Sequence, residues 1–229
     1  MPHARDYIVV SRRQETPTTA TLSLAPMQGP LPMWRPGQCL TVYFPDLSET
    51  LGKLYSISSA PSEGILTITV KGMGRFSNRL CALKEGDCLL ASLPHGTFMS
   101  DTAGPLVLVA GGMGITPFRG MLIEAAASLR PVVRLLYSAK YACDMPFSEA
   151  LAALAEGSST VTLERFTTKG LIVTPGVKNR RMRTEDILHQ TPEDAHYLIS
   201  GSLSFVLGIR NELRKSGIPR ADILTEVYF

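Results

Sequence analysis

Cysteine is scarce and scattered in this chain of 229 residues. The four cysteines, Cys39, Cys81, Cys88 and Cys143, form no C-x-x-C pair. An iron–sulfur cluster needs closely grouped thiolates, so the spacing excludes one. The same spacing offers no disulfide framework, and we expect the thiols to be reduced and mostly buried.

An excess of one charge is also lacking. The net charge is only +3, with 19% charged and 45% hydrophobic residues, as in ordinary soluble globular proteins. No basic block follows an aromatic-rich segment, so the sequence does not indicate a nucleic-acid partner. We interpret the one basic cluster, "KNRRMR" at residues 178–183, as a solvated loop, with an anion site as the alternative.

Long hydrophobic runs are absent as well. The longest, "PLVLVAGGMGITPF" at residues 105–118, is interrupted by glycines and is too short to span a bilayer as a helix. The first residues, "MPHARDYIVVSRRQ", lack the continuous apolar stretch of a secretory signal. We therefore predict a cytoplasmic protein with no membrane segment.

Residues 1–100 contain short alternating or β-branched segments between Pro- and Gly-rich turns. This spacing predicts a small antiparallel barrel or sandwich. The expected strands are residues 6–13, 19–24, 38–44, 53–58, 64–70 and 87–93, and the one helical pattern among them is at residues 75–83.

From residue 104 onward, apolar runs alternate with helical segments. Alternation of this kind predicts a parallel sheet covered on both faces. We place the domain boundary near residues 100–104, which gives domains at residues 1–100 and 104–229. The expected strands are residues 106–110, 132–138, 160–166 and 196–200, and the expected helices are residues 117–129, 147–155 and 203–215.

The strongest local signal is the glycine turn in "VAGGMGITPF". A strand ends at Ala110, Gly111, Gly112 and Gly114 follow, and Thr116 is placed to cap the next helix. Glycines let a ligand approach the backbone, and a helix N-terminus attracts anions, so we expect a phosphate or pyrophosphate here. A tight packing corner is the alternative. The turn is neither G-x-G-x-x-G nor a P-loop.

The segment "KLYSISSAP" at residues 53–61 combines a cation, a ring and hydroxyls. In a strand, Lys53 and Tyr55 leave by one face, while Leu54 and Ser56 leave by the other. A charge beside a flat ring suits a ligand that is aromatic at one place and anionic nearby. An edge strand with a half-exposed tyrosine is the alternative.

A second anion site is suggested by "GMGRFSNRL". Gly72 and Gly74 loosen the turn, and Ser77 lies at the start of the helical pattern. A helix capped without any ligand is equally compatible with this segment. If the two segments meet in space, Lys53 supplies a positive charge here.

The chain ends on "ILTEVYF", a carboxylate followed by two rings. Terminal residues usually fray, so apolar residues to the last position indicate that the rings have a place to bind. The alternative is a final sheet strand, with Glu226 and Tyr228 on one face and Val227 and Phe229 on the other.

Taken together, the order of these features resembles the ferredoxin–NADP reductase-like flavoproteins. The matching segments are "PGQCLTVYFP", "KLYSISSAP", "VKGMGRFSNRL…LKEGD", "SLPHGTF", "VAGGMGITPFRGML", "LLYSAKYACDMPFSEAL", "YLISGSLSF" and "TEVYF". The resemblance covers essentially the whole chain. It implies a six-stranded antiparallel flavin-binding barrel at residues 1–100 and an NAD(P)-binding α/β domain at residues 104–229, without an iron–sulfur domain.

The resemblance implies specific flavin contacts. Tyr55 stacks on the flavin ring, Ser56 hydrogen-bonds near its N5, and Lys53 replaces the family's arginine at the pyrophosphate. Lysine keeps the charge but loses the bidentate fork. A pyrophosphate implies FAD rather than FMN. The implied contacts are Lys53, Leu54, Tyr55, Ser56, Val70, Lys71, Gly74, Arg75, Phe76 and Ser77. Glu226 and Tyr228 are implied at the flavin's other face, and Phe229 is an extra aromatic contact past that position.

The resemblance also implies a coenzyme site. The loop of Gly111, Gly112 and Gly114 receives the coenzyme pyrophosphate, with Thr116 near the nicotinamide. Ser200 stands where the family usually has cysteine. The implied catalytic set is Ser56, Ser200, Glu226 and Tyr228.

The choice between NADH and NADPH stays open. The family's Y-x-x-R stretch reads Tyr137 to Lys140 here, and its Ser-Arg pair reads Thr167-Thr168. Cations nearby could replace the missing arginines at a 2′-phosphate. These are Lys140, Lys169, Arg180, Arg181 and Arg183.

The function implied is hydride transfer from NADH or NADPH to FAD, followed by single-electron transfer to a separate acceptor. A ferredoxin, a flavodoxin or an oxygenase component would be that acceptor. The alternative is a degenerate flavin-binding subunit that regulates or scaffolds a complex, to which the departures at Lys53 and Ser200 point.

Overall fold

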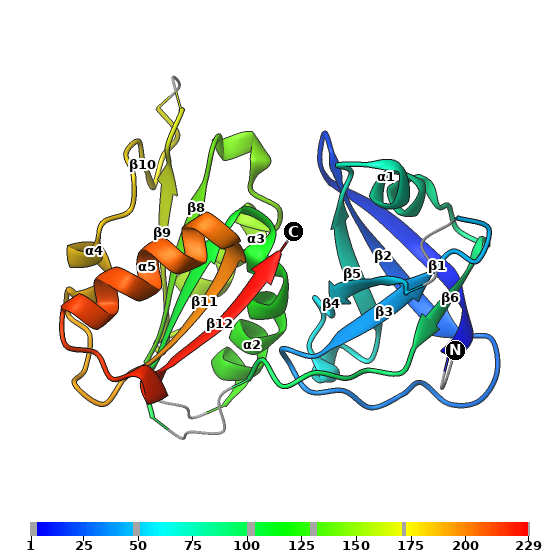
Figure 1. The fold of residues 1–229 in the computed structure, drawn as a ribbon, viewed down its shortest axis with the longest axis horizontal. Helices are drawn as coiled ribbons and strands as arrows, with labels where there is room; N and C mark the ends of the chain where they lie inside the picture. Colours follow the sequence, from blue (N-terminus) through cyan, green and yellow to red (C-terminus); the bar gives the residue numbers. More distant parts are fainter. Residues whose placement is uncertain (1–3, 48–50, 100–103, 129–131, 171–172, 229) are drawn as a thin grey trace.

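In a computed structural model, the chain is described over residues 4–47, 51–99, 104–128, 132–170 and 173–228. Two bodies lie side by side, each built on one sheet (Figure 1). The first six strands form one sheet and the last six form the other, so the chain passes from one body to the other once. Residues 100–103, where we place the domain boundary, lie outside the described residues, as does Phe229.

The first sheet is antiparallel, with strand order β4-β3-β6-β1-β2-β5. A bridge between Ile57 and Ile68 joins the chain just after β4 to β5 and closes the sheet into a barrel. The strands are β1 (Ala4–Thr16), β2 (Thr19–Pro26), β3 (Cys39–Tyr43), β4 (Lys53–Ser56), β5 (Leu66–Lys71) and β6 (Cys88–Ser92).

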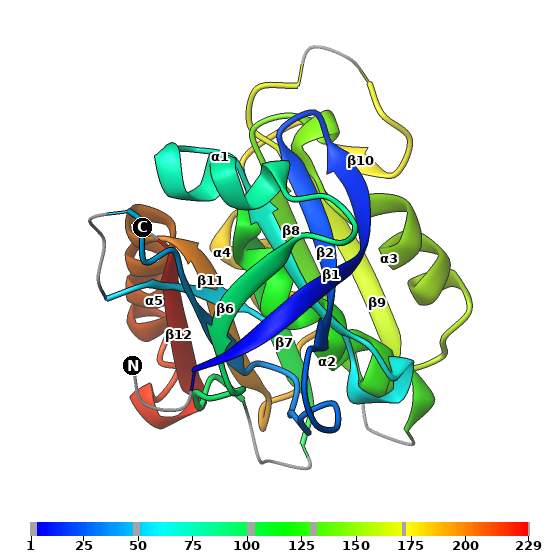
Figure 2. The same cartoon turned by 90° about the vertical axis from the view of Figure 1, so that its right-hand side faces the viewer.

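Alternating side chains fill this barrel. On β2, Leu22 and Leu24 point inward, and on β5 Leu66, Ile68 and Val70 do the same. Helix α1 (Arg75–Ala82) covers one end, with Phe76 and Leu80 buried against the core (Figure 2). The predicted antiparallel barrel and its single helix are confirmed.

The second sheet is parallel, with strand order β10-β9-β8-β7-β11-β12. The order reverses between β7 and β11, and in open α/β sheets ligands bind at the carboxyl ends beside such a reversal. The elements are β7 (Leu106–Gly111), α2 (Thr116–Ala127), β8 (Val133–Ala139), α3 (Ser148–Glu156), β9 (Val161–Thr167), β10 (Val177–Lys178), α4 (Thr184–Leu188), β11 (His196–Ser202), α5 (Leu203–Lys215) and β12 (Ile223–Tyr228).

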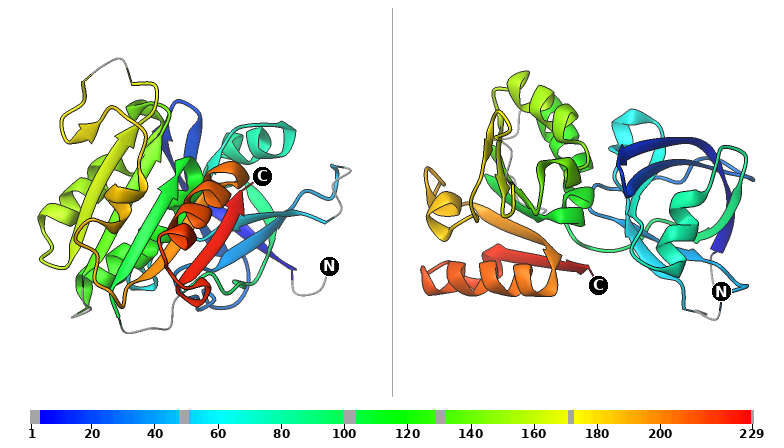
Figure 3. Two further views of the ribbon diagram at one scale, coloured as in Figure 1. Left: turned by 60° about the vertical axis from the view of Figure 1, so that its left-hand side comes forward. Right: turned by 90° about the horizontal axis from the view of Figure 1, so that it is seen from above.

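Both faces of this sheet are covered (Figure 3). Leu106, Leu108 and Ala110 of β7 pack with α2 and α3, whereas Val107 and Val109 pack with α4 and α5. Strands buried on both faces need continuous apolar runs, which is why β7 and β8 were recognisable from sequence. The predicted parallel sheet and its three long helices are confirmed.

Two expectations need correction. Cys88 and Cys143 are exposed and the other two cysteines only partly buried, because Cys88 begins β6 and Cys143 lies in a short 3₁₀ turn, η3 (Ala142–Asp144). The short elements β10 and α4 were not predicted, since neither has a recognisable period. Among the described residues, no helix has the length and apolarity to cross a membrane.

Helix α2 holds the two bodies together. Arg119 donates to the carbonyl of Ser58 at 3.0 Å and makes two 2.8 Å bonds with the Glu63 carboxylate. At Gly120 an added Cβ would lie 2.7 Å from the carbonyl oxygen of Ser59, so only glycine allows this approach. The barrel is therefore fixed relative to the parallel sheet by backbone contact and a bidentate ion pair.

We expect Arg119→Ala to lower the free energy of unfolding by about 1 kcal/mol, because it removes the bidentate partner of the partly exposed Glu63 carboxylate and the donor to the Ser58 carbonyl. Urea unfolding measures this. Lys215→Ala is the matched control, since Lys215 pairs with Glu212 on the surface with side chains 74% and 50% exposed. Equal losses in the two variants would show that the Arg119 pair does not hold the bodies together.

Candidate active site

Hydroxyl and carboxyl groups from both bodies meet at the carboxyl end of the parallel sheet. Tyr228 of β12 shares its hydroxyl with Ser56 of β4 in a short hydrogen bond and with Thr116 Oγ1 at 3.0 Å. The same hydroxyl donates to Glu226 Oε2 at 3.0 Å, and Ser56 Oγ donates to that oxygen at 3.3 Å. The opening strand of the barrel and the last strand of the chain thus form one polar cluster.

Burial controls the electrostatics of this cluster. Ser56 is 5% exposed and Thr116 2% exposed. Burial raises the pKa of the Glu226 carboxyl, and hydrogen bonds from Tyr228 and Ser56 offset this only in part. Burial, together with the nearby Glu226 charge, also raises the pKa of the Tyr228 hydroxyl. Glu226 therefore holds a proton more readily than an exposed glutamate does.

We expect Glu226→Gln to gain stability relative to the wild type as pH rises. The folded state binds the Glu226 proton more tightly than the unfolded state. A rise in pH towards the raised folded pKa therefore lowers the stability of the wild type, whereas Glu226→Gln lacks this proton. The difference between the variant and the wild type should grow with pH from the ordinary value of 4.5 upward. Urea unfolding across this range checks it, and a difference independent of pH would contradict the buried carboxyl.

The glycine turn lies beside this cluster. Strand β7 leads into a 3₁₀ turn, η2 (Gly112–Ile115), that continues directly into α2. Gly112 has φ +56°, and a Cβ there would meet no heavy atom within 4 Å, so its outer side is open. Thr116 is not the N-cap we predicted. The 3₁₀ turn already places it in helical conformation, and its hydroxyl donates to the Met113 carbonyl at 2.9 Å.

Gly111 and Gly114 serve packing. A Cβ on Gly114 would lie 2.0 Å from the carbonyl oxygen of Ser200, and one on Gly111 would lie 2.7 Å from the ring of Phe205. The packing alternative thus holds for Gly111 and Gly114, whereas a ligand at Gly112 stays a prediction. Gly112 faces open space, and its two neighbours bring β7 against β11 and α5.

Ser200 is fully buried beside the cluster. Its Cα pairs in register with Glu226 on β12 and Ala110 on β7. Among the described residues, Ser200 Oγ has no hydrogen-bond partner. Buried hydroxyls are nearly always paired, so this orphaned group suits a ligand that brings its own polar atom. All four predicted catalytic residues therefore occupy one region.

The two proposed anion segments of the barrel also meet. Lys53 Nζ lies 5.4 Å from the centroid of the Phe76 ring, and the Tyr55 ring stacks on Phe76 at 6.3 Å with an interplanar angle of 18°. The segments "KLYSISSAP" and "GMGRFSNRL" thus meet in space, which is what the expected contribution of the Lys53 charge requires. Phe76 is itself buried in the barrel, so it supports Tyr55 and Lys53 from behind.

The side chain of Ser77 caps the turn before α1. Its Oγ accepts from the backbone N–H groups of Met73 at 2.9 Å and Gly74 at 3.1 Å, as a ligand-free cap would. A Cβ on Gly74 would meet nothing within 4 Å, so the turn is also open to a ligand. Of the remaining predicted contacts here, Arg75 is exposed, while the Val70 side chain points into the barrel core.

Comparisons with known proteins agree with this fold. A family model described as "Oxidoreductase NAD-binding domain" matches residues 108–211. A flavohemoprotein from Candida albicans is 31% identical over 231 residues, which cover 94% of this chain and 58% of the relative. The flavohem-like FAD/NAD-binding domain of nitric oxide dioxygenase from Vibrio cholerae superposes with a TM-score of 0.86 at 22% identity, covering 98% of both chains.

A ferredoxin NADP⁺ reductase from Neisseria gonorrhoeae, solved with FAD and NADP bound, superposes with a TM-score of 0.83 at 21% identity over the full length of both chains. Residues 108–211 thus match the oxidoreductase NAD-binding domain family, and the whole chain has the two-domain fold of the ferredoxin–NADP reductase-like proteins. It spans about 60% of the length of flavohemoproteins such as those from Candida albicans and Dictyostelium discoideum.

Within this reductase-like fold, the structure shows one further cluster that the sequence did not reveal. Cys39 pairs in register with Ser56, its Sγ lies 3.7 Å from His95 Nδ1, and Thr41 Oγ1 lies 2.9 Å from the other ring nitrogen of His95. Burial, with a smaller contribution from the Glu226 charge, raises the pKa of the Cys39 thiol to about 11. The segments "PGQCL" and "SLPHGTF" carried the resemblance, but no spacing showed that they adjoin.

Two cations of the "KNRRMR" cluster already have partners in this reductase-like domain. Arg180 makes a bidentate ion pair with Asp186, whose pKa falls to about 2 mainly through that bond. Lys178 pairs with Glu164 at 2.7 Å. Lys140 and Lys169 stay exposed near the ends of β8 and β9. Among the cations we named, these two are better placed for a phosphate than Arg180.

Proposed function

We propose that this protein is an FAD-dependent NAD(P)H oxidoreductase, with residues 1–100 binding FAD and residues 104–229 binding the coenzyme. One observation carries this proposal. Ser56 of the barrel shares hydrogen bonds with Tyr228 and Glu226 where the strand order of the parallel sheet reverses. Such a junction holds a redox group and a dinucleotide in contact.

The residues present fit FAD. Tyr55 offers a ring backed by Phe76, and Lys53 offers a charge beside the open turn at Gly74. Gly112 leaves its outer side open to the coenzyme pyrophosphate, and the orphaned hydroxyl of Ser200 faces no protein partner among the described residues. When bound, FAD accepts hydride from a reduced nicotinamide and releases electrons one at a time.

The chain's own groups have distinct tasks in this proposal. With FAD bound, Ser56 would direct its fixed hydroxyl to the flavin, and the Tyr228 ring would cover the flavin on the side of the parallel-sheet domain. Glu226 Oε2 accepts hydrogen bonds from both, so a proton held there can pass through Ser56 Oγ. Thr116 and Ser200 line the nicotinamide side. The protein thus supplies orientation and proton control.

The electron acceptor is proposed to be a separate protein. A ferredoxin, a flavodoxin or an oxygenase component is the class expected from sequence. A haem protein is a further candidate acceptor, because the relatives are flavohemoproteins and this chain spans only about 60% of their length.

Reductive titration followed by an acceptor screen tests this function. The purified protein should be yellow, and anaerobic NADH or NADPH should bleach the flavin band. Reoxidation by ferredoxin, flavodoxin or a ferric haem protein then ranks the acceptors. A yellow protein that neither coenzyme reduces would favour the scaffold alternative, to which Lys53 and Ser200 point.

We expect Tyr55→Ala to weaken FAD binding about fivefold, because one aromatic stacking contact contributes roughly 1 kcal/mol. Flavin content after purification and fluorescence titration of the apoprotein measure the loss. Tyr55→Phe is the matched control and should keep nearly normal affinity, since it retains the ring. Equal FAD affinity in Tyr55→Ala and the wild type would remove Tyr55 from the flavin site.

A further inference from the structure

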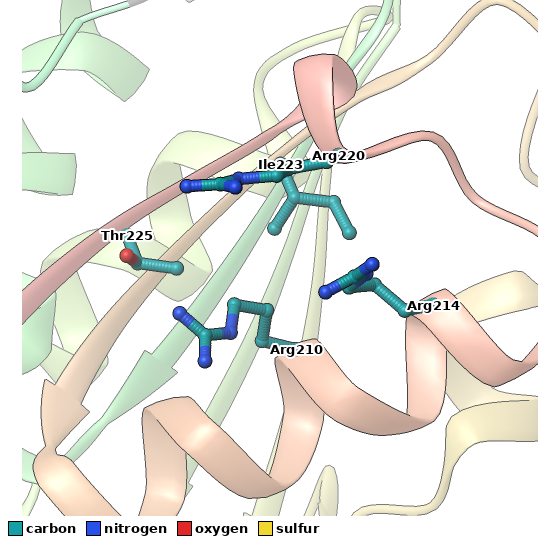
Figure 4. A pocket seen from close by; sticks show the side chains of 5 residues that line it. All are labelled: Arg210, Arg214, Arg220, Ile223 and Thr225. Atoms are coloured by element: carbon teal, nitrogen blue, oxygen red, sulfur yellow. The ribbon is translucent and has the colours of Figure 1, made fainter.

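A cleft of about 320 Å³ lies between α5 and β12, on the edge of the parallel sheet (Figure 4). Arg210 and Arg214 extend from α5 toward the strand, and Arg220 approaches from the 3₁₀ turn before β12. Ile223 and Thr225 form the wall on the strand side. Three guanidinium groups thus surround one space.

None of these three side chains has a hydrogen bond or ion pair within the described part of the chain. The Nε of Arg210 is buried there with no acceptor. Other arginines of this domain are paired, as Arg180 is with Asp186 and Arg134 with Glu164. Like charges gathered without a counter-charge repel one another, and a buried donor is normally satisfied, so the cleft is suited to an anion.

The cleft is separate from the coenzyme site. Ile223 and Thr225 point toward α5, whereas Leu224 and Glu226 leave β12 by the other face. Ile223 pairs with Tyr197 at the beginning of β11, while Ser200 lies three residues further on. The cleft therefore opens near the amino ends of the strands, on the opposite face from the candidate active site.

The lining defines the chemistry of its ligand. Guanidinium groups bind phosphate oxygens in pairs, and three of them match roughly three negative charges, as a diphosphate carries. Within the described part of the chain, no aromatic side chain lines the cleft, so stacking is not available to hold a base. Beside Ile223 and the Thr225 hydroxyl there is room for a small group attached to the diphosphate. The cleft volume is at the lower end for small-molecule sites.

We propose that the cleft between α5 and β12 binds the diphosphate group of a small molecule through Arg210, Arg214 and Arg220. This site is additional to the FAD and coenzyme sites. It does not depend on the proposed function.

Isothermal titration of the purified chain with inorganic pyrophosphate at low salt tests the proposal. We expect one saturable site that weakens as salt rises, and a rise in melting temperature with ligand. Arg214→Gln and Arg220→Gln, both at exposed positions, should each weaken binding about tenfold. Lys215→Gln is the matched control, because it removes the neighbouring charge of α5 without lining the cleft, and it should bind within about twofold of the wild type.

Three results would overturn the proposal. The first is no binding at millimolar pyrophosphate. The second is equal affinity in the wild type, Arg214→Gln and Arg220→Gln, which would place the anion at another site, such as the loop at Gly112. The third is saturable binding of a polyglutamate peptide without binding of pyrophosphate, which would identify the cleft as a contact for an acidic protein segment.

Discussion

Ser56→Ala is expected to slow flavin reduction about 100-fold while leaving coenzyme affinity nearly unchanged. A preorganised donor that acts at the reacting centre typically contributes 10²- to 10³-fold in rate, and removing it affects binding much less. Ser56 Oγ is buried and held by Tyr228 and Glu226, so its orientation is fixed before the coenzyme arrives. Anaerobic stopped-flow reduction at several coenzyme concentrations separates rate from affinity.

Ser58→Ala is the matched control for this prediction. Ser58 lies two residues further along and is fully buried, but it hydrogen-bonds to Thr67 and Thr69 inside the barrel. Its loss should lower stability by about 1 kcal/mol or more and leave the reduction rate close to normal. If Ser56→Ala instead raised the apparent dissociation constant with an unchanged limiting rate, Ser56 would belong to the binding surface and not to the reacting centre.

Gly114→Ala should cost more than about 4 kcal/mol of stability, or prevent folding of the second domain altogether. Its Cβ would lie 2.0 Å from the Ser200 carbonyl oxygen, and both groups belong to backbone that cannot move separately from the sheet. Thermal unfolding monitored by circular dichroism, or the yield of folded protein, measures this.

Gly208→Ala is the matched control in the same domain. Gly208 lies within α5, where a Cβ would meet nothing within 4 Å, so alanine should stabilise the helix by up to about 1 kcal/mol. A Gly114→Ala variant that melts with the wild type would show that β7 and β11 do not approach as closely as described here.

The sequence predicted the parts of the fold that follow from local periodicity. Strand β7 is a continuous apolar run, β8 is interrupted only by Arg134 and Ser138, and α5 repeats Val206 and Leu213 on its buried side, so each is recognisable alone. Strand β10 has two residues and α4 has five, too few for any period. Thr116 was misassigned as a cap because the preceding 3₁₀ turn depends on the contact between Gly114 and β11.

The candidate site was predictable only in part. Ser56 and Glu226 were named from motifs, but their contact joins residues 170 positions apart, and no local pattern shows it. The Cys39–His95 contact was missed for the same reason, as it depends on the pairing of β3 with the chain after β6. The ion pair of Arg180 with Asp186 was also not foreseen, and it makes Arg180 less suited than Lys140 and Lys169 to the coenzyme phosphate.

The central claim is that hydride passes directly from a nicotinamide to FAD held between the barrel and the parallel sheet. The most direct measurement is anaerobic stopped-flow bleaching of the FAD-loaded protein by NADH and NADPH, each with hydrogen or deuterium at the transferred position. We predict saturable bleaching by at least one coenzyme that is slower with deuterium. A protein that retains FAD but shows no bleaching with either coenzyme would contradict the account.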